Sequence, residues 1–88
     1  MNNAKRLINE ITTILELIKE TIPEENIRDA NDLLKHNEWG EALTLICTQL
    51  YEYDVPIKRE VYNRIEATGH QMQMSPEEWK MLKELIAG

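Results

Sequence analysis

The sequence predicts an all-α protein, a compact bundle of about five short helices that forms one domain over residues 1–88. Apolar residues recur at steps of three and four along nearly the whole chain, which is the period of an amphipathic helix. The sequence shows no alternating pattern of a strand, and only short connections separate the helical segments. With 42% hydrophobic residues, the chain can form a core without a disulfide or a metal.

Two helices are expected before residue 37. The first covers about residues 4–21 and ends before Pro23, because proline cannot continue a helix. Its apolar stripe consists of Leu7, Ile11, Ile14, Ile18 and Ile22. The second helix has Thr21 or Ile22 at its cap position and Pro23 in its first turn, and it runs to about His36. Its core side consists of Ile27, Ala30 and Leu34.

The third helix is expected over about residues 38–53, with Asn37 as its N-terminal cap. Its stripe consists of Trp39, Leu43, Ile46, Leu50 and Tyr53. A stripe of this length predicts the central helix of the fold, and it places Tyr53 in the core. Gly40 in the first turn either permits the close approach of another backbone or marks an irregular start.

Two further helices are expected after Pro56. The fourth covers about residues 58–68, and Gly69 is its expected C-terminal cap. Ser75 and Glu78 have the spacing of a capping box and mark the start of the fifth. The inward residues of these two helices are Val61, Tyr62, Ile65, Trp79, Leu82 and Ile86.

The net charge of the chain is concentrated in its middle third. Residues 1–23 and residues 57–88 each carry equal numbers of acids and bases, whereas residues 24–56 carry eight acids and two bases, which gives the full charge of −6. A segregated block of one sign attracts a partner of the opposite charge and speeds its encounter. It also repels nucleic acid and anionic membranes, so neither is expected as a partner.

The sequence contains no set of residues that would carry catalysis, and we expect neither an enzyme nor a cofactor. The two histidines lie at expected helix ends, and the spacings of a metal site or a phosphate-binding loop are not found. Cys47 lies in an apolar run and is expected to be a buried, unreactive thiol. No signal peptide or apolar span is recognised, which predicts a cytoplasmic protein.

The acidic block supplies the candidate partner-binding residues, from two successive helices and the loop after them. Leu45 lies on the side of the third helix that carries acids, so it is either an apolar anchor with a polar rim or a core residue packed on the first or fifth helix. The candidate residues are Glu25, Asp29, Asp32, Glu38, Glu41, Leu45, Gln49, Tyr51, Glu52 and Asp54.

Three elements of the sequence point to a family. NEWGEAL at residues 37–43 is followed by LYEYDVPI at residues 50–57 and by Trp79 with Leu82. In this combination the chain resembles the MafI-type immunity proteins over about residues 28–86. These are small acidic helical proteins encoded beside secreted polymorphic toxins, including effectors of contact-dependent growth inhibition.

The resemblance implies an inhibitor that binds the C-terminal domain of its cognate toxin. In such systems the toxin is often a nuclease of the EndoU-like RNase type, whose basic cleft suits an acidic surface. A monomer in a 1:1 complex is expected because each apolar stripe can be buried by another helix of the same chain. The alternative is an acidic helical adaptor or regulatory protein that binds a basic protein partner. A homo-oligomeric structural protein is a third reading, and it requires an exposed apolar stripe.

Overall fold

The computed structural model describes residues 3–87 and confirms the all-α class. Four α-helices are followed by two short 3-10 helices, so the expected fifth helix is a 3-10 structure in two pieces. The elements are α1 (Asn3–Ile18), α2 (Glu24–Lys35), α3 (Trp39–Glu52), α4 (Arg59–Gln71), η1 (Pro76–Glu78) and η2 (Lys80–Leu85).

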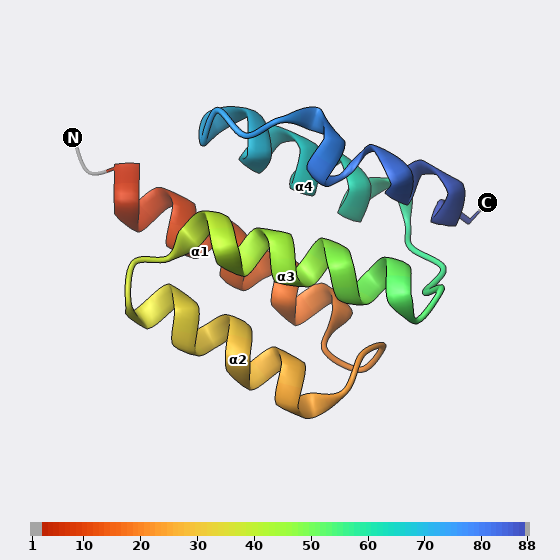
Figure 1. Ribbon diagram of the computed structural model, residues 1–88, viewed down its shortest axis with the longest axis horizontal. Helices are drawn as coiled ribbons and strands as arrows, with labels where there is room; N and C mark the ends of the chain where they lie inside the picture. Colours follow the sequence, from red (N-terminus) through yellow and green to blue (C-terminus); the bar gives the residue numbers. More distant parts are fainter. Residues whose placement is uncertain (1–2, 88) are drawn as a thin grey trace.

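Helix α3 is the central element, as its long stripe predicts. In Figure 1 it lies between α2 on one side and α4 with the C-terminal segment on the other, and α1 passes behind it. Its core residues are Ala42, Leu43, Ile46, Cys47 and Leu50, each at most 1% exposed. Helices α2 and α3 form the most extensive helix pair, which fixes the position of the acidic segment relative to the core.

The connection between α1 and α2 corrects the predicted cap. Helix α1 ends at Ile18, three residues early, because the Thr21 hydroxyl and amide both donate to the Ile18 carbonyl and turn the chain. Pro23 is then the N-cap residue of α2, with ψ at 144°, rather than a residue of its first turn. The Pro23 carbonyl accepts from the Asn26 amide at 3.0 Å, so the proline still starts the helix.

Three of the helices end in the same way, with a non-glycine residue in the left-handed conformation. These residues are Asn37 (φ 62°) after α2, Asp54 (φ 54°) after α3 and Gln73 (φ 57°) after α4. In each turn the next amide bonds back to the fifth residue before it, which is the Schellman pattern. The bonds are Glu38 N to Leu33 O at 2.8 Å, Val55 N to Leu50 O at 3.0 Å and Met74 N to Gly69 O at 3.0 Å. Asn37 therefore closes α2, and Glu38 is the N-cap of α3.

The left-handed residue Gln73 leads to a testable expectation. Left-handed backbone costs a non-glycine residue about 1 kcal/mol, so Gln73→Gly should raise the free energy of unfolding by about 0.5–1 kcal/mol. The matched control is Ala67→Gly, an exposed position inside α4, which should lower it by about 1 kcal/mol. Chemical denaturation of the two variants measures both changes, and destabilisation by Gln73→Gly would contradict the assigned turn.

Gly69 is a residue of α4 and does not cap it, because the helix continues to Gln71. A Cβ atom at this position would lie only 2.7 Å from two carbons of the Trp79 ring. The ring is 1% exposed and also meets His70 edge-on, with ring centroids 5.2 Å apart. The glycine thus provides the space in which Trp79 anchors the C-terminal segment on α4.

The C-terminal segment is held by side-chain and backbone bonds that replace the expected capping box. The Ser75 hydroxyl accepts from the Glu77 amide, whereas the Glu78 carboxylate accepts from Thr44 of α3 at 3.2 Å. Ile57 and Ile86 form a parallel bridge. Its bonds run from Ile57 N to Leu85 O and from Ala87 N to Ile57 O, both at 2.9 Å. Ile86 is only half-buried, and the core residues here are Trp79, Leu82 and Leu85.

Candidate functional site

The eight acids of residues 24–56 are all exposed, and among the described residues they form no ion pair. They are Glu24, Glu25, Asp29, Asp32, Glu38, Glu41, Glu52 and Asp54. The four ion pairs of the described chain all lie in the neutral flanks, between Lys19 and Glu16, Arg64 and Glu10, Arg64 and Glu60, and Lys80 and Glu77. Within residues 3–87, no acid of the middle segment is therefore held in an ion pair.

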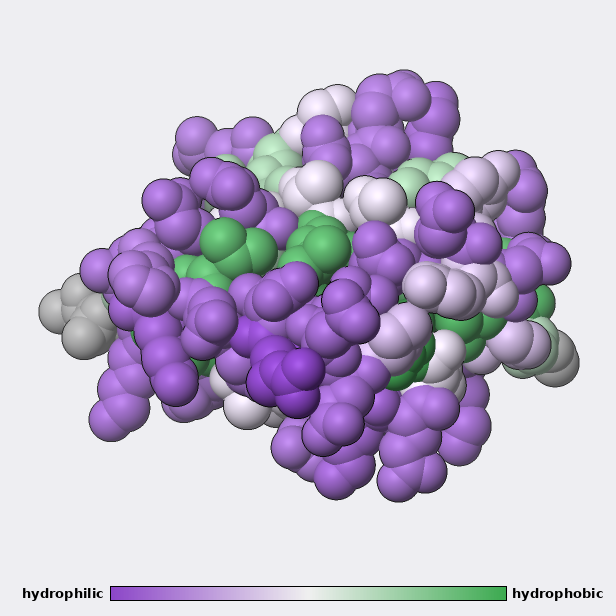
Figure 2. Space-filling model, turned by 60° about the horizontal axis from the view of Figure 1, so that its bottom comes forward, coloured by the Kyte–Doolittle hydropathy of each residue, from purple (hydrophilic) through white to green (hydrophobic). Residues whose placement is uncertain are grey.

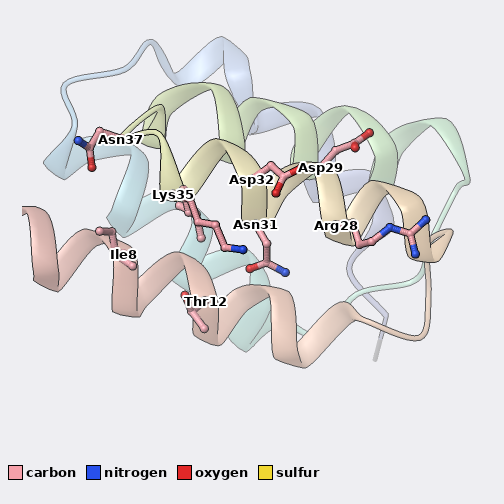
Figure 3. Close-up of a pocket in the computed structure, with 9 residues that line it drawn as sticks. Ile8, Thr12, Arg28, Asp29, Asn31, Asp32, Lys35 and Asn37 are labelled. Carbon is pink, nitrogen blue, oxygen red and sulfur yellow. The ribbon is translucent and has the colours of Figure 1, made fainter.

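The two bases of this segment, Arg28 and Lys35, line a hollow between α2 and α1 together with Asp29 and Asp32. Figure 3 shows Asn31 and Lys35 directed from α2 toward α1, where they line this hollow with Ile8 and Thr12, and Arg28 lies at its far end. The side chain of Asp29 points from α2 toward α3. Asp29 and Asp32 thus border two hollows of α2: the one beside α1, which also contains both bases, and one beside α3, which contains neither base.

The acidic edge of α2 and the facing part of α3 enclose a shallow groove, which we call the α2–α3 groove. Its lining residues are Asp29, Asp32, Leu33, His36, Glu38 and Leu45. Leu33 and Leu45 are half-buried and pack against the core, so they form the apolar floor. Figure 2 shows α2 turned forward, where hydrophobic surface forms small patches among hydrophilic side chains. Leu45 packs against the core and remains partly exposed where it lines the groove with residues of α2.

The groove brings together four of the ten candidate residues, namely Asp29, Asp32, Glu38 and Leu45. It also contains Leu33 and His36, which the sequence reasoning did not select. The signal for Leu33 is its position four residues after Asp29, which places both on one side of the helix. His36 is the C-cap residue of α2, and its Nδ1 lies 2.8 Å from the Asp32 carbonyl oxygen.

The remaining candidates are distributed around the groove. Gln49 accepts a hydrogen bond from the Asn26 amide group at 3.0 Å, so it joins α3 to α2. Glu41 and Glu52 are exposed along α3. Thr44 hydrogen-bonds to Glu78 of η1, so its side of α3 faces the C-terminal segment and not the groove. Tyr51 follows Thr44 by seven residues, or two helical turns, and therefore lies on that same side. The other outlying candidates are Glu25 in the first turn of α2 and Asp54 in the turn after α3.

Tyr53 is 52% exposed, and its predicted burial is wrong. Helix α3 ends at Glu52, so Tyr53 is its C-cap residue and no longer follows the helical stripe. Tyr51 is 46% exposed. The two tyrosines therefore present large amphipathic side chains beside the acids of this end of α3.

The described part of the chain holds no group of three or more histidine, cysteine or acidic residues placed to bind a metal ion. Within the same residues, each helix is too short or too polar to cross a membrane. Cys47 is buried, as predicted, and its burial together with the charge of Glu78 raises the pKa of its thiol to about 12. The raised pKa keeps the thiol protonated, and therefore unreactive, at neutral pH.

The buried thiol leads to an expectation for reactivity and pH dependence. At pH 8 iodoacetamide should alkylate Cys47 at least about 100-fold more slowly in the native protein than in the unfolded chain. The unfolded thiol ionises near 9.0 and the folded one near 12, so the free energy of unfolding should fall between these pH values, by up to about 1.4 kcal/mol per unit. Cys47→Ala should remove this contribution, and rapid alkylation of the native protein would contradict the assignment.

Comparisons of the chain with models of protein families, with curated proteins and with solved structures give no match.

Proposed function

We propose that this chain is an immunity protein that binds and neutralises a cognate secreted toxin domain through the acidic surface of α2, α3 and the turn after α3. The observation that carries the proposal is the set of eight exposed acids without an ion-pair partner among the described residues. Unpaired carboxylates on a rigid surface produce a field that attracts a basic protein. The resemblance to MafI-type proteins supplies the class of that partner.

A nuclease, with an EndoU-like RNase favoured, suits this surface for a physical reason. A nuclease must attract phosphates, so its active cleft is basic, and an acidic helical surface competes with the nucleic acid for that cleft. The chain acts without catalysis in this proposal, as a monomer in a 1:1 complex in the cytoplasm. The large hydrophobic residues exposed in the described chain are Leu17, Tyr51 and Tyr53, which do not form a continuous helical stripe of the kind a homo-oligomer needs.

Capture of the partner tests the proposal. The tagged chain is retained from a lysate of its own cells, and the captured protein is identified by mass spectrometry and assayed for RNase activity. A single basic toxin domain whose activity disappears when the chain is added supports an immunity protein. Recovery of a regulator or a polymerase component, with no toxin, would instead support the acidic adaptor.

Charge reversal at the edge of the surface gives a kinetic expectation. Glu41→Lys and Asp54→Lys should each slow association with the toxin domain, by about tenfold at low ionic strength, because each weakens the field that guides the encounter. The loss should shrink as salt is added, since a Debye length of about 8 Å at 0.15 M screens exposed charges. Stopped-flow association rates measure the effect, and unchanged rates for both variants would remove α3 and its following turn from the interface.

A further inference from the structure

The α2–α3 groove is bounded at both ends by bonds that join its two walls. At one end the turn between the helices is closed by the bond from the Glu38 amide to the Leu33 carbonyl at 2.8 Å. Further along, the bond between Asn26 and Gln49 ties α2 to α3. A site held in this way loses little conformational freedom when a partner binds.

The groove is short, and its two leucines form a single apolar patch on its floor. From Asp29 to His36 the helix rises by about 10 Å, which is the length of two helical turns. Leu33 from α2 and Leu45 from α3 both line its floor, and both are half-buried against the core. A floor of this size accommodates one apolar side chain of a partner.

The rim of the groove carries three carboxylates from both walls. Asp29 and Asp32 lie on α2, and Glu38 lies at the start of α3. All three are exposed, and they form no ion pair among the described residues. Charge complementarity therefore selects a cationic occupant. It disfavours a second copy of the chain, whose equivalent rim would repel this one, and it disfavours a nucleic acid.

We propose that the α2–α3 groove receives a short basic segment of the partner protein, which seats one apolar side chain between Leu33 and Leu45 and pairs lysine or arginine side chains with the rim acids. This inference rests on the proposed function, and it names the part of the toxin domain that this chain recognises. The apolar contact and the charge pairs are made only after docking, so they slow dissociation, whereas the acids outside the groove guide the encounter.

Two double variants with the same change of net charge separate the groove from the rest of the acidic surface. Asp29→Asn with Asp32→Asn alters the rim, and Glu24→Gln with Asp54→Asn alters exposed acids at the start of α2 and in the turn after α3, which do not line the groove. With the captured toxin domain, the rim variant should raise the dissociation rate by about tenfold or more, and the control by less than about threefold. Equal effects on dissociation would overturn the groove assignment.

A second measurement does not depend on the toxin. The chain is titrated with a peptide of about nine residues, in which lysines surround one central leucine, and with the same peptide carrying serine at the centre. Amide chemical shifts should change most at Leu33, His36 and Leu45 with the leucine peptide, and weakly across residues 24–54 with the serine peptide. Identical shift maps, no shifts at millimolar peptide, or the largest shifts outside the groove would overturn the inference.

The outcomes distinguish the two proposals. If the chain neutralises its toxin but the two double variants dissociate equally fast, the groove assignment fails and the immunity function stands. If the leucine peptide occupies the groove but no toxin is captured, the immunity function fails and the groove remains a site for a basic segment of another protein.

Discussion

Gly69→Ala should lower the free energy of unfolding by about 3 kcal/mol, the largest effect expected for so small a change in this chain. The added methyl group would overlap the Trp79 ring, which is buried and cannot move outward without opening the core. Displacement of this ring would also weaken the attachment of the C-terminal segment to α4. Urea denaturation followed by tryptophan fluorescence and by circular dichroism measures the change.

The matched control is Gly40→Ala, the same substitution in the first turn of α3. There the nearest heavy atom to an added Cβ is the Met74 sulfur at 3.9 Å, an ordinary contact, so the variant should be stabilised by up to about 1 kcal/mol through helix propensity. In a Trp79→Leu background, Gly69→Ala should lose most of its cost. An equal cost in both backgrounds would mean that the glycine is needed for a reason other than the ring.

Reversal of three acids outside the groove should slow toxin association by about 10- to 1,000-fold at low ionic strength. The variant Glu25→Lys, Glu41→Lys, Glu52→Lys changes the net charge from −6 to zero, because each substitution adds two charges. All three side chains are exposed, so the fold should be retained. The on-rate is measured by stopped flow over a range of salt concentrations.

A control variant with the same final charge tests whether position matters. Glu16→Lys, Glu20→Lys and Glu84→Lys also give zero net charge, and these exposed acids belong to the neutral flanks. This control should slow association by less than about tenfold, because the local field of the acidic surface remains. If both triple variants slowed association equally, net charge rather than the α2–α3 surface would govern the encounter.

The helical pattern of the sequence predicts most of the fold because it depends on local periodicity. The stripe of α1 is buried as expected, as are Leu43, Ile46 and Leu50 of the α3 stripe, and α3 is the central helix. Element ends are less well predicted, since they depend on how the chain leaves the helix. Tyr53 continues the stripe of α3 in sequence, yet it lies beyond the last helical residue and is exposed.

The two glycine positions show why tertiary contacts limit such predictions. A glycine near the end of a helical pattern, such as Gly69, is typical of a C-terminal cap. In the structure Gly69 lies inside α4, and its lack of a side chain leaves space for the ring of Trp79, ten residues further along the chain. The left-handed turn falls instead on Gln73, a residue with little intrinsic preference for that conformation. The bonds and contacts of the C-terminal segment outweigh local preference there.

The candidate surface was partly predictable for the same physical reasons. The exposure of the acids follows from their position opposite the core stripe of α2 and α3, so sequence spacing is sufficient. The α2–α3 groove requires knowledge of which helices pack together, and that knowledge adds Leu33 and His36 and moves Tyr51 to another side. Spacing alone cannot supply this pairing.

The most direct test of the account is an inhibition titration of the captured toxin domain with the purified chain. We expect RNase activity to decrease linearly as the chain is added and to reach zero at one chain per toxin. When both proteins are at limiting concentrations, the variant with asparagine in place of the rim acids Asp29 and Asp32 should leave part of the RNase activity. Toxin activity that persists at a large excess of the chain would contradict the proposal that this acidic helical protein is an immunity protein.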